Sequence, residues 1–279
     1  MTGCVGPRLL GDGTSVSVGS PAQGLLRRAA RLPFDGDGYS VSAEWRRRGA
    51  SYGADELLDL IVRVGRRVSR EFPGAILGVA DLSGRSGGAL PLHGSHMSGR
   101  DVDVHPYSMD GQGRVLLPPQ SVMVRFGANG WAQLPAVIAG ERLLTAEPRR
   151  FDDARNWALV RAFLSDPYVD VQWIFIGSEL AQRLLRFASA RHEPEPLIAY
   201  ASQVLRQPND AQSHDDHFHV RIFCSPDDRV LGCEDRGPSR WLKKQLKYGS
   251  PFGRVSAVGE SLNARITTRV FAWPGCFSL

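Results

Sequence analysis

Apolar residues recur at the spacing of an amphipathic helix between Asp55 and Phe72, where leucine, isoleucine and valine are interspersed with charged residues. Pro73-Gly74 follows directly, and this pair is expected to end the helix. The same spacing predicts three further helices, over residues 153–164, 178–191 and 196–206.

Shorter patterns predict strands between these helices. Two apolar runs, over 75–80 and 171–176, are typical of buried strands. The segments 100–105 and 217–223 alternate polar and apolar residues, which predicts strands with one polar face. A glycine-rich loop is expected over 83–94. Because the elements follow no regular βαβ order, we expect an α+β fold with a small antiparallel sheet flanked by helices.

The N-terminal region is unusual in composition. Residues 1–40 are rich in glycine, serine and proline, so their first part is expected to lie outside the packed core. The chain begins Met1-Thr2-Gly3-Cys4, and it contains no hydrophobic signal sequence. A small residue and a glycine before cysteine resemble the end of a bacterial lipoprotein signal. One interpretation is therefore a lipid anchor at Cys4 with the true start further upstream; the other is an ordinary short N-terminus.

Composition and charge exclude some classes of function. The chain has 279 residues, 42% of them hydrophobic, but no run of about eighteen apolar residues that would predict a transmembrane segment. The net charge of +5 is modest and is spread along the chain. No basic run is interleaved with aromatic residues, so we expect no nucleic-acid partner. A polyanionic substrate is compatible with the charge.

Four cysteines are present, and none forms a Cys-x-x-Cys pair of the kind found in structural zinc ribbons. Cys224 and Cys233 flank a turn-rich stretch over 225–228. A disulfide between them would fit an oxidising compartment.

Six of the seven histidines fall in two short segments, which random placement of a rare residue would seldom produce. The histidines of the two segments are His93, His96 and His105, and His214, His217 and His219. Alternation along strands puts Asp101, Asp103 and His105 on one face, and His217, His219 and Arg221 on one face of the second strand. Gly94 and Gly99 would allow the loop to bring His96 back beside Asp103.

This combination of side chains favours a metal site. Two imidazoles and a carboxylate suit zinc, and three protein ligands leave a fourth position for water, as in catalytic sites. The metal would acidify that water, and a nearby histidine would accept its proton as general base. A lone His-x-His is more often a surface pair, but His-x6-Asp together with a downstream His-x-His reverses those odds. A serine nucleophile is disfavoured, because the chain has no Gly-x-Ser-x-Gly elbow.

The two motifs resemble those of the superfamily that joins lysostaphin-type peptidases, D-Ala-D-Ala metallopeptidases and hedgehog domains. The segments 93–104 and 214–221, followed by Cys224 and Cys233, more closely resemble penicillin-insensitive murein endopeptidases. We therefore expect a zinc peptidase domain over 17–236. A flexible segment over 1–16, in one interpretation the remnant of a lipoprotein signal, would precede it, and an extension of unknown role over 237–279 would follow.

The resemblance implies a role for individual residues. The matches to the zinc ligands are His96, Asp103 and His219, with one Zn²⁺ expected per chain. His217 matches the catalytic base, His214 a histidine that stabilises the transition state, and His93 a further histidine near the metal. Some relatives carry a downstream Asp-x-x-His that can hold extra metal, and this chain shows no counterpart.

The activity implied by the resemblance is hydrolysis of the D-alanyl–meso-diaminopimelyl cross-links of peptidoglycan. The partners would be peptidoglycan stem peptides, and the location extracytoplasmic, either periplasmic or anchored to the outer membrane. One alternative is a D,D- or L,D-carboxypeptidase that acts on the same stem peptides. The other is a zinc-bearing cell-wall binding module without turnover, which His217 and His214 disfavour because such a module needs no proton shuttle.

Overall fold

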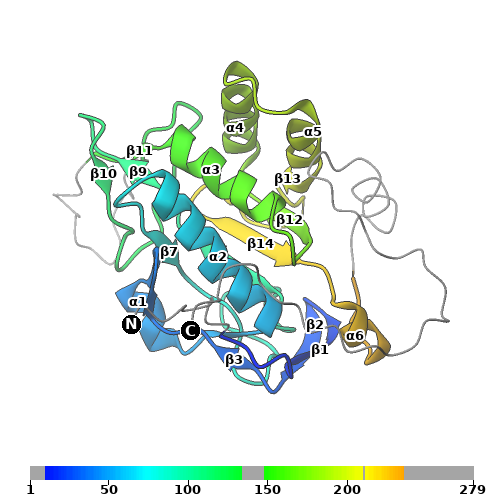
Figure 1. Cartoon of the computed structure of the whole chain (residues 1–279). Helices are drawn as coiled ribbons and strands as arrows, with labels where there is room; N and C mark the ends of the chain where they lie inside the picture. The colour runs from blue at the N-terminus through cyan, green and yellow to red at the C-terminus, as the bar shows by residue number, and fades with distance from the viewer. Residues whose placement is uncertain (1–9, 134–147, 210, 236–279) are drawn as a thin grey trace, which may run out of the picture.

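A computed structural model describes residues 10–133, 148–209 and 211–235 of the chain. Cys4, residues 1–9 of the expected N-terminal segment and the expected extension over 237–279 lie outside these described residues. The described chain forms an α+β fold in which helices pack on a mixed β-sheet (Figure 1).

The largest sheet has seven strands in the order β13-β12-β14-β8-β7-β5-β4. Their bounds are Asp35–Gly36 (β4), Tyr39–Val41 (β5), Leu77–Val79 (β7), Asp101–Val104 (β8), Val171–Phe175 (β12), Leu205–Arg206 (β13) and Phe218–Ile222 (β14). The β12–β13 and β5–β7 pairings are parallel, and the others are antiparallel. The expectation of a small antiparallel sheet is therefore wrong: the sheet is larger and mixed. Strands β4, β5 and β13 have only two or three residues, too few to show an alternating pattern.

The four helices that the apolar spacing predicts are confirmed. The six helices of the described residues are Ala43–Arg48 (α1), Asp55–Glu71 (α2), Asp153–Leu164 (α3), Ser178–Ala190 (α4), Glu195–Val204 (α5) and Pro226–Val230 (α6). Helix α5 ends earlier than expected, because Leu205 and Arg206 instead pair with β12. Figure 1 shows α2 and α3 side by side over the sheet, with α4 and α5 packed beyond α3.

Smaller sheets surround this layer, and the N-terminal region takes part in them. Their strands are Val16–Ser20 (β1) with Gln23–Arg27 (β2), Ala30–Arg31 (β3) with Tyr52–Gly53 (β6), and Ser108–Met109 (β9) with Val115–Leu116 (β10) and Arg150–Phe151 (β11). The later part of residues 1–40 belongs to the packed core. Leu26, Leu32 and Tyr39 are all buried. Gly19, the fourth residue of β1, has φ 72°, a conformation that favours glycine, just before the turn into β2.

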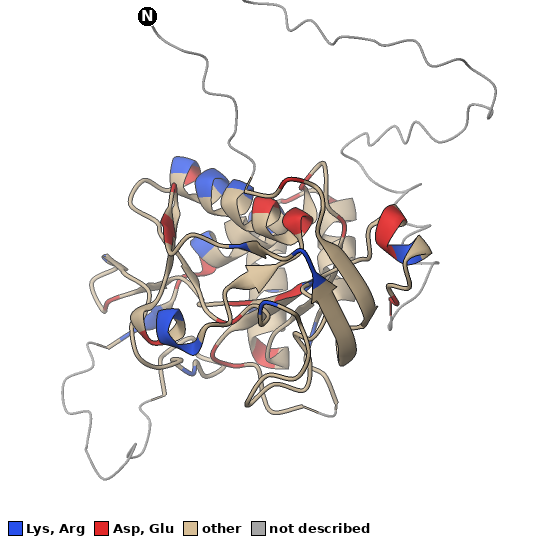
Figure 2. Ribbon diagram, turned by 90° about the horizontal axis from the view of Figure 1, so that it is seen from below, with Lys and Arg blue, Asp and Glu red and all other residues tan. Residues whose placement is uncertain are grey.

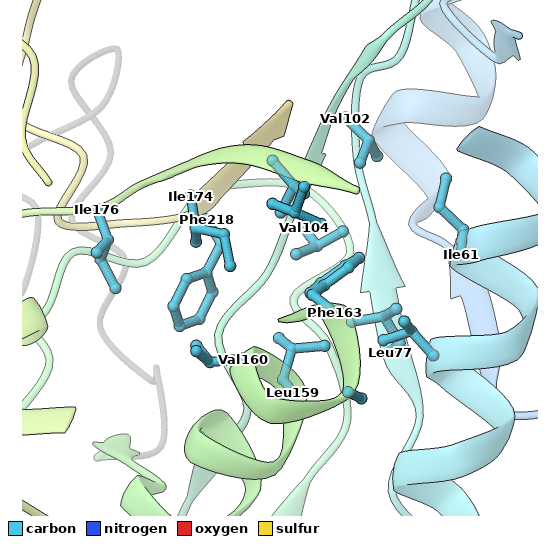
Figure 3. Packing of buried hydrophobic residues seen from close by; sticks show 14 of the residues in the cluster. Ile61, Leu77, Val102, Val104, Leu159, Val160, Phe163, Ile174, Ile176 and Phe218 are labelled. Carbon is cyan, nitrogen blue, oxygen red and sulfur yellow. The ribbon is translucent and has the colours of Figure 1, made fainter. Parts of the chain in front are cut away.

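The core fills the space between the sheet and helices α2 and α3 (Figure 3). Val104 of β8 and Phe218 of β14 point toward Leu159 of α3 in this layer. Because side chains alternate along β8, Asp101 and Asp103 must face the opposite side. Both carboxylates are nevertheless buried, since the loop that precedes β8 covers that side. The polar face of the strand is therefore enclosed rather than open to solvent.

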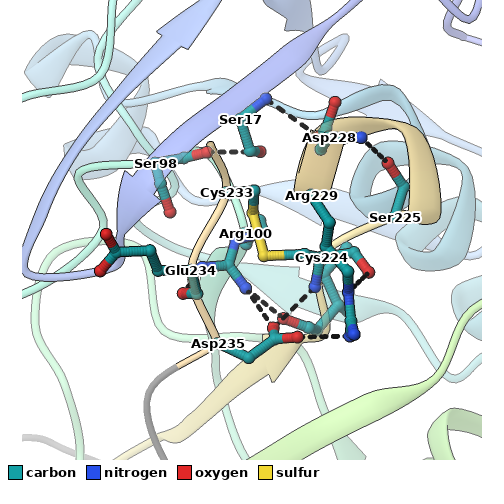
Figure 4. Close-up of a disulfide and its surroundings, with 11 residues drawn as sticks. Ser17, Ser98, Arg100, Cys224, Ser225, Asp228, Arg229, Cys233, Glu234 and Asp235 are labelled. Atoms are coloured by element: carbon teal, nitrogen blue, oxygen red, sulfur yellow. Dashed lines mark hydrogen bonds and ion pairs between the residues drawn. A yellow bond between two sulfur atoms is a disulfide. The ribbon is translucent and has the colours of Figure 1, made fainter. Parts of the chain in front are cut away.

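A disulfide joins the end of β14 to the segment after α6, which confirms the expected Cys224–Cys233 bridge (Figure 4). The bridged segment is tied to the N-terminal hairpin, because Gly19 donates to the Gly232 carbonyl at 2.8 Å. Buried Arg100 adds an ion pair with Asp235 at 3.0 Å. These contacts fix the end of β14 against β1.

Charge of both signs is distributed over the described surface (Figure 2). Helix α1 ends in the basic run Arg46-Arg47-Arg48, whereas α6 carries Asp227 and Asp228 beside Arg229. None of the described helices has both the length and the apolar character that a bilayer crossing requires.

Candidate metal centre

The carboxylate of Asp103 lies at the centre of the predicted histidine cluster. The antiparallel pairing of β14 with β8 places His219 directly opposite Asp103. Asp103 Oδ1 lies 3.3 Å from His219 Nδ1, 3.4 Å from His96 Nε2 and 3.6 Å from His217 Nε2. Asp103 Oδ2 lies 3.8 Å from His93 Nδ1. The structure thus brings both histidine segments around one carboxylate.

His96 is placed by the loop that precedes β8. Its backbone adopts φ 67°, an uncommon value for a residue other than glycine. Its ring Nδ1 lies 2.8 Å from the carbonyl oxygen of Leu82, to which it donates. This contact orients the ring so that Nε2 faces Asp103. Ser83 holds the same loop, because its hydroxyl donates to the His96 carbonyl and accepts from Gly99 N–H.

His219 is oriented by Asp101, two residues before Asp103 on β8. Its ring Nε2 lies 2.9 Å from Asp101 Oδ1, which leaves Nδ1 directed at Asp103. Asp101 also accepts from Arg221 Nε at 2.6 Å and from the backbone N–H of His96 at 3.2 Å. Burial would raise the pKa of Asp101, but the charge of Arg221 holds that pKa below its usual range. One ionised carboxylate therefore orients residues of both segments.

His93 and His217 are oriented in the same way by carboxylates outside the cluster. His93 Nε2 lies 3.0 Å from Asp81 Oδ2, and Asp81 is in turn paired with Arg48 at 2.8 Å. His217 Nδ1 lies 2.6 Å from Asp216 Oδ1. In each histidine the other ring nitrogen faces Asp103.

His214 lies at the edge of the cluster. Its ring centroid is 4.9 Å from that of His217, and its backbone N–H donates to Gln207 Oε1 at 2.8 Å. Burial lowers the pKa of His214, so its ring is neutral near pH 7. Its buried Nδ1 has no hydrogen-bond partner among the described residues.

His105 does not join the cluster, although the alternation puts it on the polar face of the strand. Its ring is buried and packs edge-on against Trp45 of α1, with centroids 4.7 Å apart. Burial lowers the pKa of His105 to about 3, so the ring is neutral.

The donor atoms around Asp103 fit a metal ion. His96 Nε2 and Asp103 Oδ1 are buried, and neither finds a hydrogen-bond partner in the described part of the chain, which is costly unless another group satisfies them. Potential ligand atoms of His93, His96 and Asp103 all lie within 4.8 Å of one another. The same holds for His214, His217 and His219. Two imidazoles and one carboxylate are typical zinc ligands, and hydrogen-bond partners that orient the imidazoles are typical of such sites.

The electrostatics of the cluster favour a positive charge beside Asp103. Burial alone would lower the pKa of His96, but the negative charge of Asp103 outweighs it and raises that pKa to about 9. Burial alone would raise the pKa of Asp103, yet the charges of His96 and His217 hold it well below its usual range. For His219, burial dominates and lowers the pKa to about 4. The carboxylate is therefore ionised and attracts a cation.

Sequence reasoning missed the groups that orient the histidines. Asp101 and Asp216 carried a visible signal, because each lies within two residues of a predicted ligand or base in the chain. Asp81 and the Leu82 carbonyl carried none, because only the fold brings residues before the loop to His93 and His96.

Comparison with known proteins identifies the family. The family model described as penicillin-insensitive murein endopeptidase matches residues 17–241. Curated relatives of that name in Escherichia coli O1:K1 / APEC and in Escherichia coli strain SMS-3-5 / SECEC are each 27% identical over 228 residues. Each alignment covers 80% of this chain and 71% of the relative. The chain therefore belongs to the penicillin-insensitive murein endopeptidase family of hydrolases.

Proposed function

We propose that this protein is a zinc metallopeptidase that hydrolyses the D-alanyl–meso-diaminopimelyl cross-links of peptidoglycan. The observation that carries the metal part is the buried pair His96 Nε2 and Asp103 Oδ1, which face each other without a hydrogen bond. Family membership supports the peptidoglycan substrate.

The proposed zinc ligands are His96, Asp103 and His219, with one Zn²⁺ per chain. All three are almost fully buried, and their orienting partners leave one nitrogen of each ring directed at the carboxylate. A bound zinc ion would polarise the scissile carbonyl and lower the pKa of a water molecule toward neutrality. His93, held by Asp81, lies beside these ligands as a further histidine of the centre.

His217 is the proposed general base. Its Nδ1 is held by Asp216, which directs Nε2 toward the centre, where it would accept a proton from the attacking water and pass it to the leaving nitrogen. Its ring is 19% exposed, whereas that of His96 is fully buried. His214 lies beside it and would stabilise the negative charge that develops on the carbonyl oxygen in the transition state.

An extracytoplasmic location, periplasmic or at the outer membrane, follows from this function, because murein lies outside the cytoplasm. The Cys224–Cys233 disulfide supports it, since such bridges persist in oxidising compartments.

Digestion of purified sacculi tests the proposed reaction. Falling muropeptide dimers with rising intact tetrapeptide monomers would support endopeptidase action. Monomer stems that lose a terminal residue while dimers persist would favour the carboxypeptidase instead. If neither the zinc-loaded protein nor its His217→Ala variant changes the muropeptides, the proposed enzyme is refuted in favour of a binding module.

A further inference from the structure

We infer that Arg125 is a specificity-determining residue that binds the carboxylate on the leaving half of the substrate, on the carbon that carries the scissile nitrogen. This inference rests on the proposed function and adds a recognition group to it. Arg125 lies outside both histidine segments, about ninety residues before the second one.

The substrate chemistry supplies such a carboxylate. Diaminopimelate is a 2,6-diamino diacid, so each of its amino groups stands on a carbon that also bears a carboxyl group. Where the carboxyl group beside the acylated nitrogen is free, it carries a negative charge, and its carbon lies two bonds from the nitrogen that leaves. An endopeptidase for this bond must therefore accommodate an anion beside the group that protonates the leaving nitrogen.

The structure places a cation near the proposed proton donor. His217 is the proposed proton donor to the leaving nitrogen, and its Nδ1 lies 2.6 Å from Asp216 Oδ1. Arg125 Nε lies 3.9 Å from Asp216 Oδ2, and Arg125 Nη1 lies 3.6 Å from Asp215 Oδ1. Arg125 is thus only one residue removed from the base, along a chain of ionic contacts.

These contacts leave the guanidinium able to bind another anion. Both are longer than hydrogen bonds, and the Arg125 side chain is 49% exposed. A guanidinium presents several donors in a fork that matches a carboxylate with two parallel hydrogen bonds. Without Arg125, the negative charges of Asp215 and Asp216 would repel a substrate carboxylate.

The backbone at Arg125 is firmly held, as a recognition residue requires. The adjacent Phe126 is buried and packs edge-on against Phe151, with centroids 5.6 Å apart. The N–H of Phe126 donates to the Asp215 carbonyl at 2.8 Å, and the Arg125 carbonyl accepts from Gln133 N–H at 2.8 Å. The side chain therefore projects from a fixed position beside the segment that carries His217.

A competing role for Arg125 is to position Asp216 and, through it, His217. The two roles differ in their dependence on the substrate. A positioning role would lower the rate on every substrate, whereas carboxylate recognition acts only on substrates that carry the free carboxylate.

The test uses two synthetic substrates in which N-acyl-D-alanine is joined to meso-diaminopimelate. In one, the carboxyl on the carbon that bears the acylated nitrogen is free; in the other, it is a primary amide. Kinetics of the zinc-loaded full chain are compared with those of Arg125→Gln, Arg125→Lys and the control Arg27→Gln. Arg27 is an exposed residue of β2 with no ion pair among the described residues, so this control removes one surface charge without touching the site.

Arg125→Gln is expected to lower kcat/KM for the free-carboxylate substrate by about 10- to 100-fold, mostly through KM, because a hydrogen-bonded charge pair is lost. Its kcat/KM for the amide should change less than about threefold, the range of minor surface effects. Arg125→Lys should recover part of the loss, and Arg27→Gln should match the wild type on both substrates.

Two results would overturn the inference. Equal losses on both substrates would assign Arg125 to positioning Asp216, and no loss on either would remove it from the site; both leave the proposed function intact. If the wild type cleaves neither substrate while zinc is bound, the proposed function itself fails, and this inference fails with it.

Discussion

The two segments that build the centre are positioned by different physical means. The second leads into β14, where strand register sets His219 opposite Asp103. The first is a loop in which His96 adopts φ 67° and its ring Nδ1 donates a hydrogen bond to the Leu82 carbonyl. The strand half therefore depends on the register of one strand pair, whereas the loop half depends on a backbone conformation and on single hydrogen bonds. Variants in each half should differ accordingly.

The largest effect is expected at Asp103, where the two halves meet. Asp103→Asn keeps the size of the side chain but removes the charge that lies 3.3 to 3.6 Å from three imidazole nitrogens. Loss of a residue that only orients a metal ligand typically lowers metal affinity by roughly 10- to 100-fold. Because Asp103 is a proposed ligand itself, we expect a larger loss of zinc affinity, and activity at background level. Zinc content after dialysis and murein digestion measure both.

Asp166→Asn is the matched control for this change. Asp166 is equally buried, but it pairs with Arg63 at 2.7 Å, away from the centre. The Asp166→Asn variant should have a lower free energy of unfolding yet retain its zinc. Full zinc content in Asp103→Asn would contradict the proposed ligand set.

The second effect separates catalysis from metal binding within the strand half. His217→Ala should keep one zinc per chain yet lose about 10²- to 10⁴-fold in rate, because the general base is removed while the ligands stay in place. Single-turnover digestion with parallel zinc analysis measures it, and His192→Ala, at an exposed site after α4, is the control. If zinc disappears together with activity, His217 is a ligand rather than a base.

How much of the site could be predicted depended on whether a repeating local pattern or a specific tertiary contact sets each group. The polar face of each strand was predictable, because the alternation that buries Val102 and Val104 directs Asp103 to the other face. The register that sets His219 opposite Asp103 was not predictable from either strand alone. The presence of His96 in the cluster was expected from its spacing. Its orientation was not, because the Leu82 carbonyl comes from a segment fourteen residues earlier.

The fold shows the same division between local and long-range information. Helix α3 begins and ends where the pattern predicts, since Asp152 caps it by accepting from Arg155 N–H and Trp157 faces the core. Strand β13 was predicted as the end of a helix. Its two residues pair in parallel with β12, and nothing in a two-residue segment signals that partner.

The third effect concerns Asp101, which links the halves by accepting from His219 Nε2 and from the His96 backbone. Asp101→Asn leaves an acceptor but removes the charge that holds Arg221 at 2.6 Å. We expect zinc affinity to fall about 10- to 100-fold with the ligands intact. Competition with a chromogenic chelator measures it, and near-ultraviolet circular dichroism checks that the fold is retained. Unchanged affinity would show that the metal alone orients both rings.

The smallest effect is expected from the loop backbone itself. Gly99 has φ 79°, and a Cβ added there would lie 2.6 Å from Leu26 Cδ1 and 3.1 Å from the backbone nitrogen of Ala54. Gly49 has a similar φ of 74°, but an added Cβ would meet no atom within 4 Å. The two glycines therefore share the conformational strain, and only Gly99 adds a steric conflict near the centre.

Gly49→Ala should lose about 1–2 kcal/mol of unfolding free energy from the left-handed conformation alone. Gly99→Ala should lose about 1–3 kcal/mol more, because Leu26 and the loop must shift to admit the methyl group. Urea unfolding measures both. Since the loop carries only His93 and His96, zinc affinity of Gly99→Ala should fall less than in Asp101→Asn. Equal unfolding free energies for the two variants would mean that the loop shifts at no cost to admit the methyl group. His96 would then need no rigid backbone to reach Asp103.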